Sequence, residues 1–317
     1  MAASTRTTVI VVTWRGRGLI GQCLDALAAQ TRPHRTLVVD NASTDGTAEE
    51  IAAHSPRPDV RRMTRNLGYA GALAAVLPQV STPFMAWLND DAQPEPGWLA
   101  ALEQALDDDD TAAAAASVLH TGDGTVTSTG VALTGLGYGQ DTIEAMPFGF
   151  CGGAALVRTD ALRAVGGVPS TLFCYYEDTD TSWRLRLAGH RVVAVAGARV
   201  QHVGGATARH GTPSFHRWNE RNRLLVLLRC APTRVAAREL ARFATLTLML
   251  PWRRNHPATP NFAWHLRLRV LAEVAARLPA TLLARYRIGR RATLTRAAVW
   301  STWASVSAST RPREETT

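Results

Sequence analysis

Short apolar runs that stop abruptly at acidic or amide side chains place the strongest limit on how this 317-residue chain can fold. The run at residues 84–88 stops at the sequence Asn-Asp-Asp, and the run at residues 36–39 stops at Asp-Asn. Carboxylates that gather at one strand end repel each other unless a positive group, most simply a divalent cation, lies between them. Ligands of open α/β sheets bind outside the carboxyl ends of the strands. The sequence therefore predicts that this sheet edge holds a cation and a diphosphate.

Helical spacing alternates with these strand patterns through the first half of the chain. A helix over residues 18–30 follows the β-branched run at 9–13, and another near 47–54 opens with two glutamates in its first turn. Strand–helix alternation of this kind predicts a mostly parallel, Rossmann-like sheet with helices on both faces.

The charge is divided unevenly along the chain. All 35 basic residues are Arg; residues 1–211 hold 16 Arg against 21 Asp and Glu, whereas residues 212–317 hold 19 Arg against 5 Glu. A basic C-terminal third indicates an anionic partner, such as a membrane surface, a lipid phosphate or nucleic acid. Nucleic acid is disfavoured, because an aromatic content of 7% offers few base-stacking side chains.

Helical patterns with periodic Arg fill the C-terminal region at residues 233–252 and 262–288. Arg234, Arg238 and Arg242 recur every four positions and so share one helix face. Such a face suits a helix resting on anionic lipid. The alternative is a helix packed on the N-terminal α/β region with its basic side in solvent.

The cysteines and the N-terminus favour the cytoplasm. The four cysteines form no CxxC pair, so neither a zinc site nor a disulfide framework is predicted. The polar first eight residues do not resemble a signal peptide, and no apolar stretch is long enough to span a bilayer. We therefore expect a cytoplasmic protein, with peripheral attachment to the inner face of the cell membrane still open.

Six motifs in order resemble the family 2 glycosyltransferases with the GT-A fold, and the resemblance covers roughly residues 7–230. They lie at residues 9–13, 38–47, 66–71, 89–91, 177–180 with 184–190, and 202–207. The resemblance implies an inverting glycosyltransferase of the kind that builds cell walls and polysaccharides, with rhamnosyl transfer common among bacterial members. It implies a GT-A catalytic domain over 1–230, a basic helical region over 231–305 and a disordered tail over 306–317.

On the donor side, the resemblance implies a nucleotide-diphosphate sugar and a divalent cation, Mg²⁺ or Mn²⁺. Asp91 is the first candidate ligand and His202 the second, since hard cations prefer oxygen and Mn²⁺ accepts imidazole. For His202 the alternative is a structural histidine, and for Asp40 it is a turn residue that satisfies its own backbone. The candidate nucleotide-binding residues are Thr13, Asp40, Asn41, Asp45, Asn66, Gly68, Asn89 and Asp90.

On the acceptor side, Asp178 is the candidate general base, because an attacking hydroxyl must lose its proton to a nearby group. Glu177 is a candidate for orienting the acceptor, a saccharide or a polyprenyl-linked saccharide. The alternative for both is an acidic helix N-terminus favoured by the helix dipole. Trp183 and Arg184 are candidate acceptor contacts, although Trp183 is equally compatible with the core.

Two other classes of function remain in view. A nucleotidyltransferase acting on a sugar phosphate would also use acidic metal ligands, but it would need a Gly-rich basic phosphate loop, and residues 15–18 match one only faintly. A non-catalytic basic binding module is the third possibility. Departures from the family pattern at residues 14–15, 72–74 and 168–170 leave the identity of the sugar open.

Overall fold

The computed structural model describes residues 5–202, 211–253, 257 and 259–305. The expected disordered tail over 306–317 and most of the motif at 202–207 lie outside these residues. Among the residues described, no helix is long and apolar enough to cross a membrane.

The first half of the main sheet is parallel, as the alternating pattern predicts. Its strands run in the order β3-β2-β1-β4. Every residue of β1 is buried, because helices cover both faces of this central strand. The four strands are β1 (Thr7–Thr13), β2 (His34–Asp40), β3 (Asp59–Arg62) and β4 (Phe84–Asn89).

The second half of the main sheet is mixed. Strand β10 pairs antiparallel with both β4 and β6, while β11 pairs parallel with β6 and antiparallel with β5. A small second sheet has the order β12-β8-β9. The strands are β5 (Ala92–Pro94), β6 (Ala112–His120), β7 (Val126–Ser128), β8 (Gly130–Thr134), β9 (Gly139–Thr142), β10 (Ala154–Arg158), β11 (Arg191–His202) and β12 (Ala304–Ser305).

Helices cover the two faces of the main sheet in separate groups. The side chains of Val9 and Val11 pack with α1, α2 and α4, and those of Ile10 and Val12 belong to the core that includes α3, α5 and α6. This alternation along β1 is the period of two that a strand imposes. The helices are α1 (Ile20–Ala28), α2 (Thr47–Ala53), α3 (Gly68–Val76), α4 (Trp98–Asp107), α5 (Thr159–Ala164) and α6 (Glu177–Leu187).

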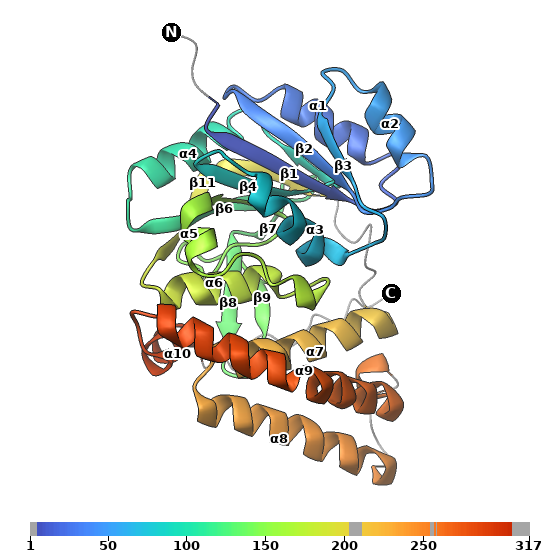
Figure 1. The fold of residues 1–317 in the computed structure, drawn as a ribbon, viewed down its shortest axis with the longest axis vertical. Helices are drawn as coiled ribbons and strands as arrows, with labels where there is room; N and C mark the ends of the chain where they lie inside the picture. The colour runs from blue at the N-terminus through green and yellow to red at the C-terminus, as the bar shows by residue number, and fades with distance from the viewer. Residues whose placement is uncertain (1–4, 203–210, 254–256, 258, 306–317) are drawn as a thin grey trace.

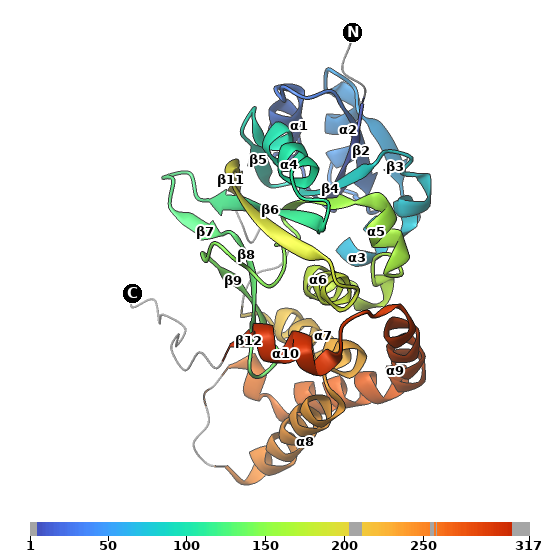
Figure 2. The same cartoon turned by 90° about the vertical axis from the view of Figure 1, so that its left-hand side faces the viewer.

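The C-terminal helices pack against the catalytic sheet domain. Figures 1 and 2 show them as a layer at the end of the molecule opposite the N-terminal strands. Phe243, Val274 and Val299 belong to the same buried core as Ile10 and Trp87 of the sheet. Part of this region is therefore packed on the rest of the chain, which was the alternative to helices resting on anionic lipid. The helices are α7 (Pro213–Cys230), α8 (Thr233–Met249), α9 (Trp264–Arg291) and α10 (Arg296–Trp303), with short 3₁₀ turns at Leu250–Trp252 and Pro260–Phe262.

Candidate active site

A cavity of about 550 Å³ lies at the carboxyl ends of β1 and β4 and is closed on its other side by the segment before α6 and by α7. It brings together residues from both predicted halves of the site. Asn41, Asn66, Gly68 and residues 89–91 line it from the donor side. Glu177 and Asp178 line it from the acceptor side, and His202 lines it from the end of β11.

A hydrogen bond from the end of β1 fixes Asp90, which lies in the acidic segment directly after β4. Thr13 does not line the cavity, but its hydroxyl donates to Asp90 Oδ2 at 2.5 Å. Burial raises the pKa of Asp90 to about 6. Gly16 packs so closely here that a Cβ would lie 2.4 Å from Asp90 Oδ2. Any side chain at position 16 would therefore disturb the Thr13–Asp90 hydrogen bond, so the turn after β1 requires glycine there.

Asp91 and His202 form a pair that can serve a cation. His202 Nε2 lies 3.1 Å from Asp91 Oδ1, and within the described residues this ion pair is the one polar contact of that buried oxygen. Burial alone would lower the pKa of His202, but the hydrogen bond and charge of Asp91 outweigh it and raise that pKa. Asn89 Nδ2 lies 3.2 Å from His202 Nε2. One carboxylate oxygen and one imidazole nitrogen thus face each other at the cavity wall.

This donor set fits a cation that is bound together with a diphosphate. Across the described residues, no three His, Cys, Asp or Glu side chains are grouped to hold a metal by themselves. Ions such as Mg²⁺ are commonly held by one or two carboxylates together with substrate phosphates. An ion bound here would have the paired Asp91 oxygen and His202 nitrogen as its protein ligands and the phosphates as the others.

Two asparagines shape the donor side of the cavity. Asn41 binds the neighbouring turn with both ends of its amide: Nδ2 donates to the carbonyl of Gly68 at 3.1 Å, and Oδ1 accepts from the amide of Leu67 at 3.0 Å. Asn66 Oδ1 accepts from the amide of Gly68 at 2.8 Å. Gly68 has a φ of +71°, and a Cβ there would lie 2.2 Å from the carbonyl oxygen of Phe173. The donor-side turn therefore touches the acceptor-side turn through a glycine.

The structure gives Asp40 and Asp45 turn roles and places neither at the cavity. Asp40 is fully buried; its Oδ1 accepts from the amide of Ser43 at 2.8 Å, and its Oδ2 lies 3.4 Å from Arg62 Nε. Asp45 Oδ1 accepts from the Thr47 hydroxyl at 2.6 Å. Both carboxylates thus contact the turn that follows β2, as the turn alternative describes, and their contact with the nucleotide stays a prediction.

Glu177 and Asp178 open α6 in different surroundings. Asp178 accepts from the amide of Gly152 at 2.9 Å and from the amide of Thr179 at 2.5 Å. Burial raises its pKa, while these amides oppose the shift. Glu177 is buried, and its Oε2 has no hydrogen-bond partner in the described part of the chain. Burial, with the charge of Asp178, raises the pKa of Glu177 to about 8.

Trp183 and Arg184, the candidate acceptor contacts, are not among the residues that line the cavity. Trp183 is fully buried and stacks on Trp300 at a ring-centroid distance of 5.9 Å, as its core alternative requires. Arg184 Nε donates to Asp180 Oδ1 at 2.6 Å in the interior. Both residues lie on the side of α6 that faces the core, so they support the helix and not a substrate.

Several cavity residues were not singled out by the sequence patterns. Phe215, Trp218 and Asn219 of α7 reach the cavity, and Tyr69 lies within it, donating its hydroxyl to the carbonyl of Gly152 at 2.7 Å. Residues 139–141 of β9 line it too. The aromatic and polar side chains gathered near the N-terminus of α7 were the available signal.

The sequence profile described as "Glycosyl transferase family 2" matches residues 8–166. The chain belongs to this family. It is therefore a glycosyltransferase with the GT-A fold, in agreement with the parallel sheet and the acidic strand end.

Individual relatives agree with this assignment. Over 231 residues the chain is 29% identical to the N-acetylglucosaminyl-diphospho-decaprenol L-rhamnosyltransferase of Mycobacterium tuberculosis, an alignment that spans 61% of this chain and 75% of that protein. The mannosyltransferase PcManGT of Pyrobaculum calidifontis, solved with GDP-Man and Mn²⁺, superposes with a TM-score of 0.52 at 21% identity, covering 94% of this chain and 79% of its own. TarS 1–349 of S. aureus with UDP-GlcNAc gives 0.55 at 18% identity, covering 94% and 91%.

Proposed function

We propose that this glycosyltransferase is metal-dependent and inverting, and that it moves a sugar from a nucleotide-diphosphate donor to a hydroxyl of a saccharide or lipid-linked saccharide. One observation carries the proposal: a single cavity is lined by the Asp91–His202 pair and by the Glu177–Asp178 pair. Transfer with inversion needs a charge-neutralising group at the leaving diphosphate and one carboxylate at the attacking hydroxyl. The cavity offers residues suited to both.

On the donor side, Asp91 and His202 would hold Mg²⁺ or Mn²⁺. When bound, such an ion neutralises the charge that grows on the diphosphate as the glycosidic bond breaks. Asn41, Asn66 and Gly68 would bring the backbone of their turns close to the nucleotide, and Asn89 and Asp90 would face ribose or coordinated water. The solved neighbours with Mn²⁺ and nucleotide sugars support this division of roles.

On the acceptor side, the two carboxyl groups would divide the work by their surroundings. Asp178 accepts two backbone amides, which favour its ionised form, so it would take the proton of the attacking hydroxyl. Glu177, with a pKa of about 8, would stay protonated near neutral pH and donate a hydrogen bond to the acceptor. Neighbouring carboxyls whose pKa values are pushed apart commonly take such different roles.

We also propose that the acceptor is lipid-linked and that the protein works at the cytoplasmic face of the membrane. The mycobacterial relative is named for a saccharide on a decaprenyl diphosphate. Arg234, Arg238 and Arg242 are exposed along α8, where they can meet anionic lipid. Co-sedimentation with vesicles containing anionic lipid tests this proposal. If a variant with all three arginines changed to Gln binds the vesicles as tightly as the unmodified chain, the proposed contact of α8 with the membrane is refuted.

The catalytic proposal is tested by donor screening followed by product analysis. Thermal shifts with UDP, GDP, dTDP and CDP, each with Mn²⁺ or with EDTA, should show one nucleotide whose stabilisation requires the metal. The matching nucleotide sugar should then release a nucleoside diphosphate. Release of pyrophosphate would instead identify a nucleotidyltransferase, and stabilisation by no nucleotide would favour a binding module.

A further inference from the structure

A strained turn directly precedes Glu177 and Asp178, the two acceptor-side carboxyl groups. Phe173, Tyr175 and Tyr176 have φ values of +69°, +70° and +69°, and Glu177 follows directly as the first residue of α6. Residues with a Cβ avoid this left-handed region, at a cost of about 1–2 kcal/mol each. A turn with three such residues persists only when surrounding groups hold it.

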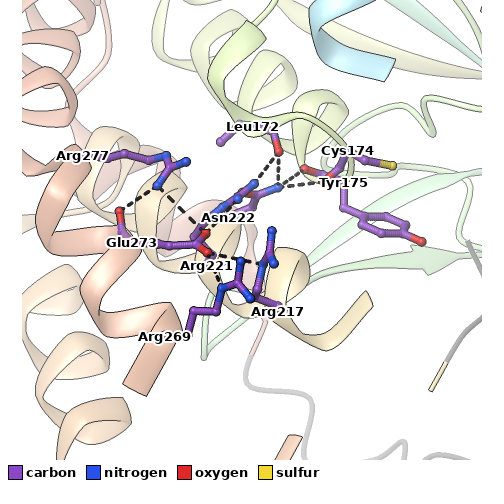
Figure 3. Close-up of polar contacts among 9 residues, drawn as sticks. All are labelled: Leu172, Cys174, Tyr175, Arg217, Arg221, Asn222, Arg269, Glu273 and Arg277. Carbon is purple, nitrogen blue, oxygen red and sulfur yellow. Dashed lines mark hydrogen bonds and ion pairs between the residues drawn. The ribbon is translucent and has the colours of Figure 1, made fainter. Parts of the chain in front are cut away.

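Asn222 of α7 is the group that makes the most contacts with this turn. Its side chain is fully buried, and Nδ2 donates toward three carbonyl oxygens: Leu172 at 3.0 Å, Cys174 at 2.8 Å and Tyr175 at 2.8 Å (Figure 3). These carbonyls converge on one amide only when the turn is bent as observed. A side chain without N–H groups at this position would leave them buried and unpaired.

Arg221 and Glu273 fix the direction in which the Asn222 amide points. Arg221 Nε donates to Asn222 Oδ1 at 2.9 Å, so the opposite end of the amide, Nδ2, must face the turn. Arg221 also donates to the carbonyl of Leu172 at 2.7 Å. On α9, Glu273 Oε2 accepts from Arg221 Nη1 at 3.0 Å (Figure 3). A continuous chain of contacts thus runs from α9 through α7 to the turn.

Glu220 and Arg223, the neighbours of this pair on α7, contact the segment that leads into β9, another wall of the cavity. Glu220 accepts from the Tyr138 hydroxyl at 2.7 Å, and the Arg223 guanidinium lies 4.4 Å from the centre of the Tyr138 ring. Tyr138 directly precedes β9, whose residues 139–141 line the cavity. All four residues of the segment 220–223 are buried although all are polar. Their hydrogen bonds and ion pairs go to cavity walls and to the other C-terminal helices.

We infer that Asn222 is a positioning residue for sugar transfer: oriented by Arg221 and Glu273, it holds the turn at 172–176 in the conformation that places Glu177 and Asp178 at the cavity. The inference rests on the proposed role of these two carboxyl groups. It gives the C-terminal helices a part in catalysis that is separate from any contact with a membrane.

The decisive variant is Asn222→Asp, which keeps the size of the side chain and replaces its N–H donors with an oxygen. The new carboxylate would face three carbonyl oxygens, so we expect the turn to open and kcat to fall about 100-fold. The KM for the donor sugar should change far less, by at most about fivefold, since Asn222 contacts the acceptor-side turn and the donor-side turn meets it only where Gly68 and Ala70 lie against Phe173. The pH dependence of kcat should also change, because Glu177 would no longer be buried in the same way. A general loss of structure would not produce this split between kcat and KM.

Two further variants complete the experiment. Asn261→Asp makes the same chemical change at the N-terminal side of α9 and should match the unmodified protein in kcat. Glu273→Gln keeps the size of its side chain and removes the charge that holds Arg221, so kcat should fall about 3- to 10-fold even if Asn222→Asp does not fold.

The possible results separate the two proposals. A folded Asn222→Asp variant with full kcat, or one whose loss lies entirely in the donor KM, overturns the positioning role. If that variant does not fold, full kcat in Glu273→Gln overturns it. Failure of the unmodified protein to release a nucleoside diphosphate from any donor sugar overturns the proposed function, and the positioning role with it.

Discussion

Replacing Glu177 with Gln should stabilise the protein at alkaline pH and leave its stability nearly unchanged at acidic pH. The carboxyl group is only 6% exposed, and burial together with the charge of Asp178 raises its pKa from 4.5 to about 8. Between these two values the folded chain keeps a proton that the unfolded chain has lost. The folded state therefore binds more protons, and the free energy of unfolding falls as the pH rises through this window.

The size of the effect follows from the width of the window. A difference of about 3.5 pKa units corresponds to about 5 kcal/mol once the pH exceeds 8, at roughly 1.4 kcal/mol per unit. Gln cannot ionise, so Glu177→Gln avoids this loss. With 1 kcal/mol shifting the melting temperature by about 2–4 °C, the variant should melt at least about 5 °C higher than the unmodified protein at pH 8.5.

Thermal and urea unfolding at pH 5, 7 and 8.5 would measure this difference. Glu144→Gln provides the matched control, since Glu144 is exposed and its replacement should not alter the pH dependence of stability. Equal melting temperatures for Glu177→Gln and the unmodified protein at pH 8.5 would refute the reasoning. Gln resembles the protonated carboxyl group, so the variant should also keep kcat within about tenfold near pH 7.

Three further predictions concern the two sides of the cavity. Asp178→Asn should keep metal-dependent nucleotide binding but lose at least about 100-fold in kcat, because it removes the carboxylate assigned to take the proton; full activity would remove the base assignment. His202→Ala should weaken Mn²⁺ binding at least about tenfold in a titration with nucleotide present, whereas His34→Ala should not. Gly68→Ala should lower the melting temperature far more than Gly18→Ala, since both glycines have positive φ values but a Cβ meets a backbone carbonyl only at Gly68.

The parallel half of the fold could be predicted because its strands are buried on both faces. Such strands appear in the sequence as unbroken apolar runs, and β1 and β4 are of this kind. Strand β11 contains an irregularity that its sequence does not announce, a shift in register between Ala194 and Arg199. Strand β6 begins with five alanines, which favour a helix by themselves, so only its burial in the sheet makes it a strand.

The site was predictable where short-range chemistry defines it. The polar residues at the end of β4 form one short run in the sequence, and the acidic residues that begin α6 form another. The structure brings both runs to one cavity. The sequence could not show that Asp40, Asp45 and Trp183 lie outside the cavity lining, because a motif records the identity of a residue but not the direction of its side chain. A turn carboxylate and a core tryptophan are as necessary to the site as a residue that touches substrate.

The role of α7 could not have been derived from the same signals. Its buried residues at 220–223 are all polar, so a search for an apolar face would assign them to solvent. Buried polar groups must be paired, and their partners here lie 47–50 residues earlier, in the turn before α6, and 52 residues later, on α9. A run of buried polar residues inside a helix is therefore a signal in its own right. In this chain it marks where α7 and α9 form the hydrogen bonds and ion pairs that fix the turn at 172–176.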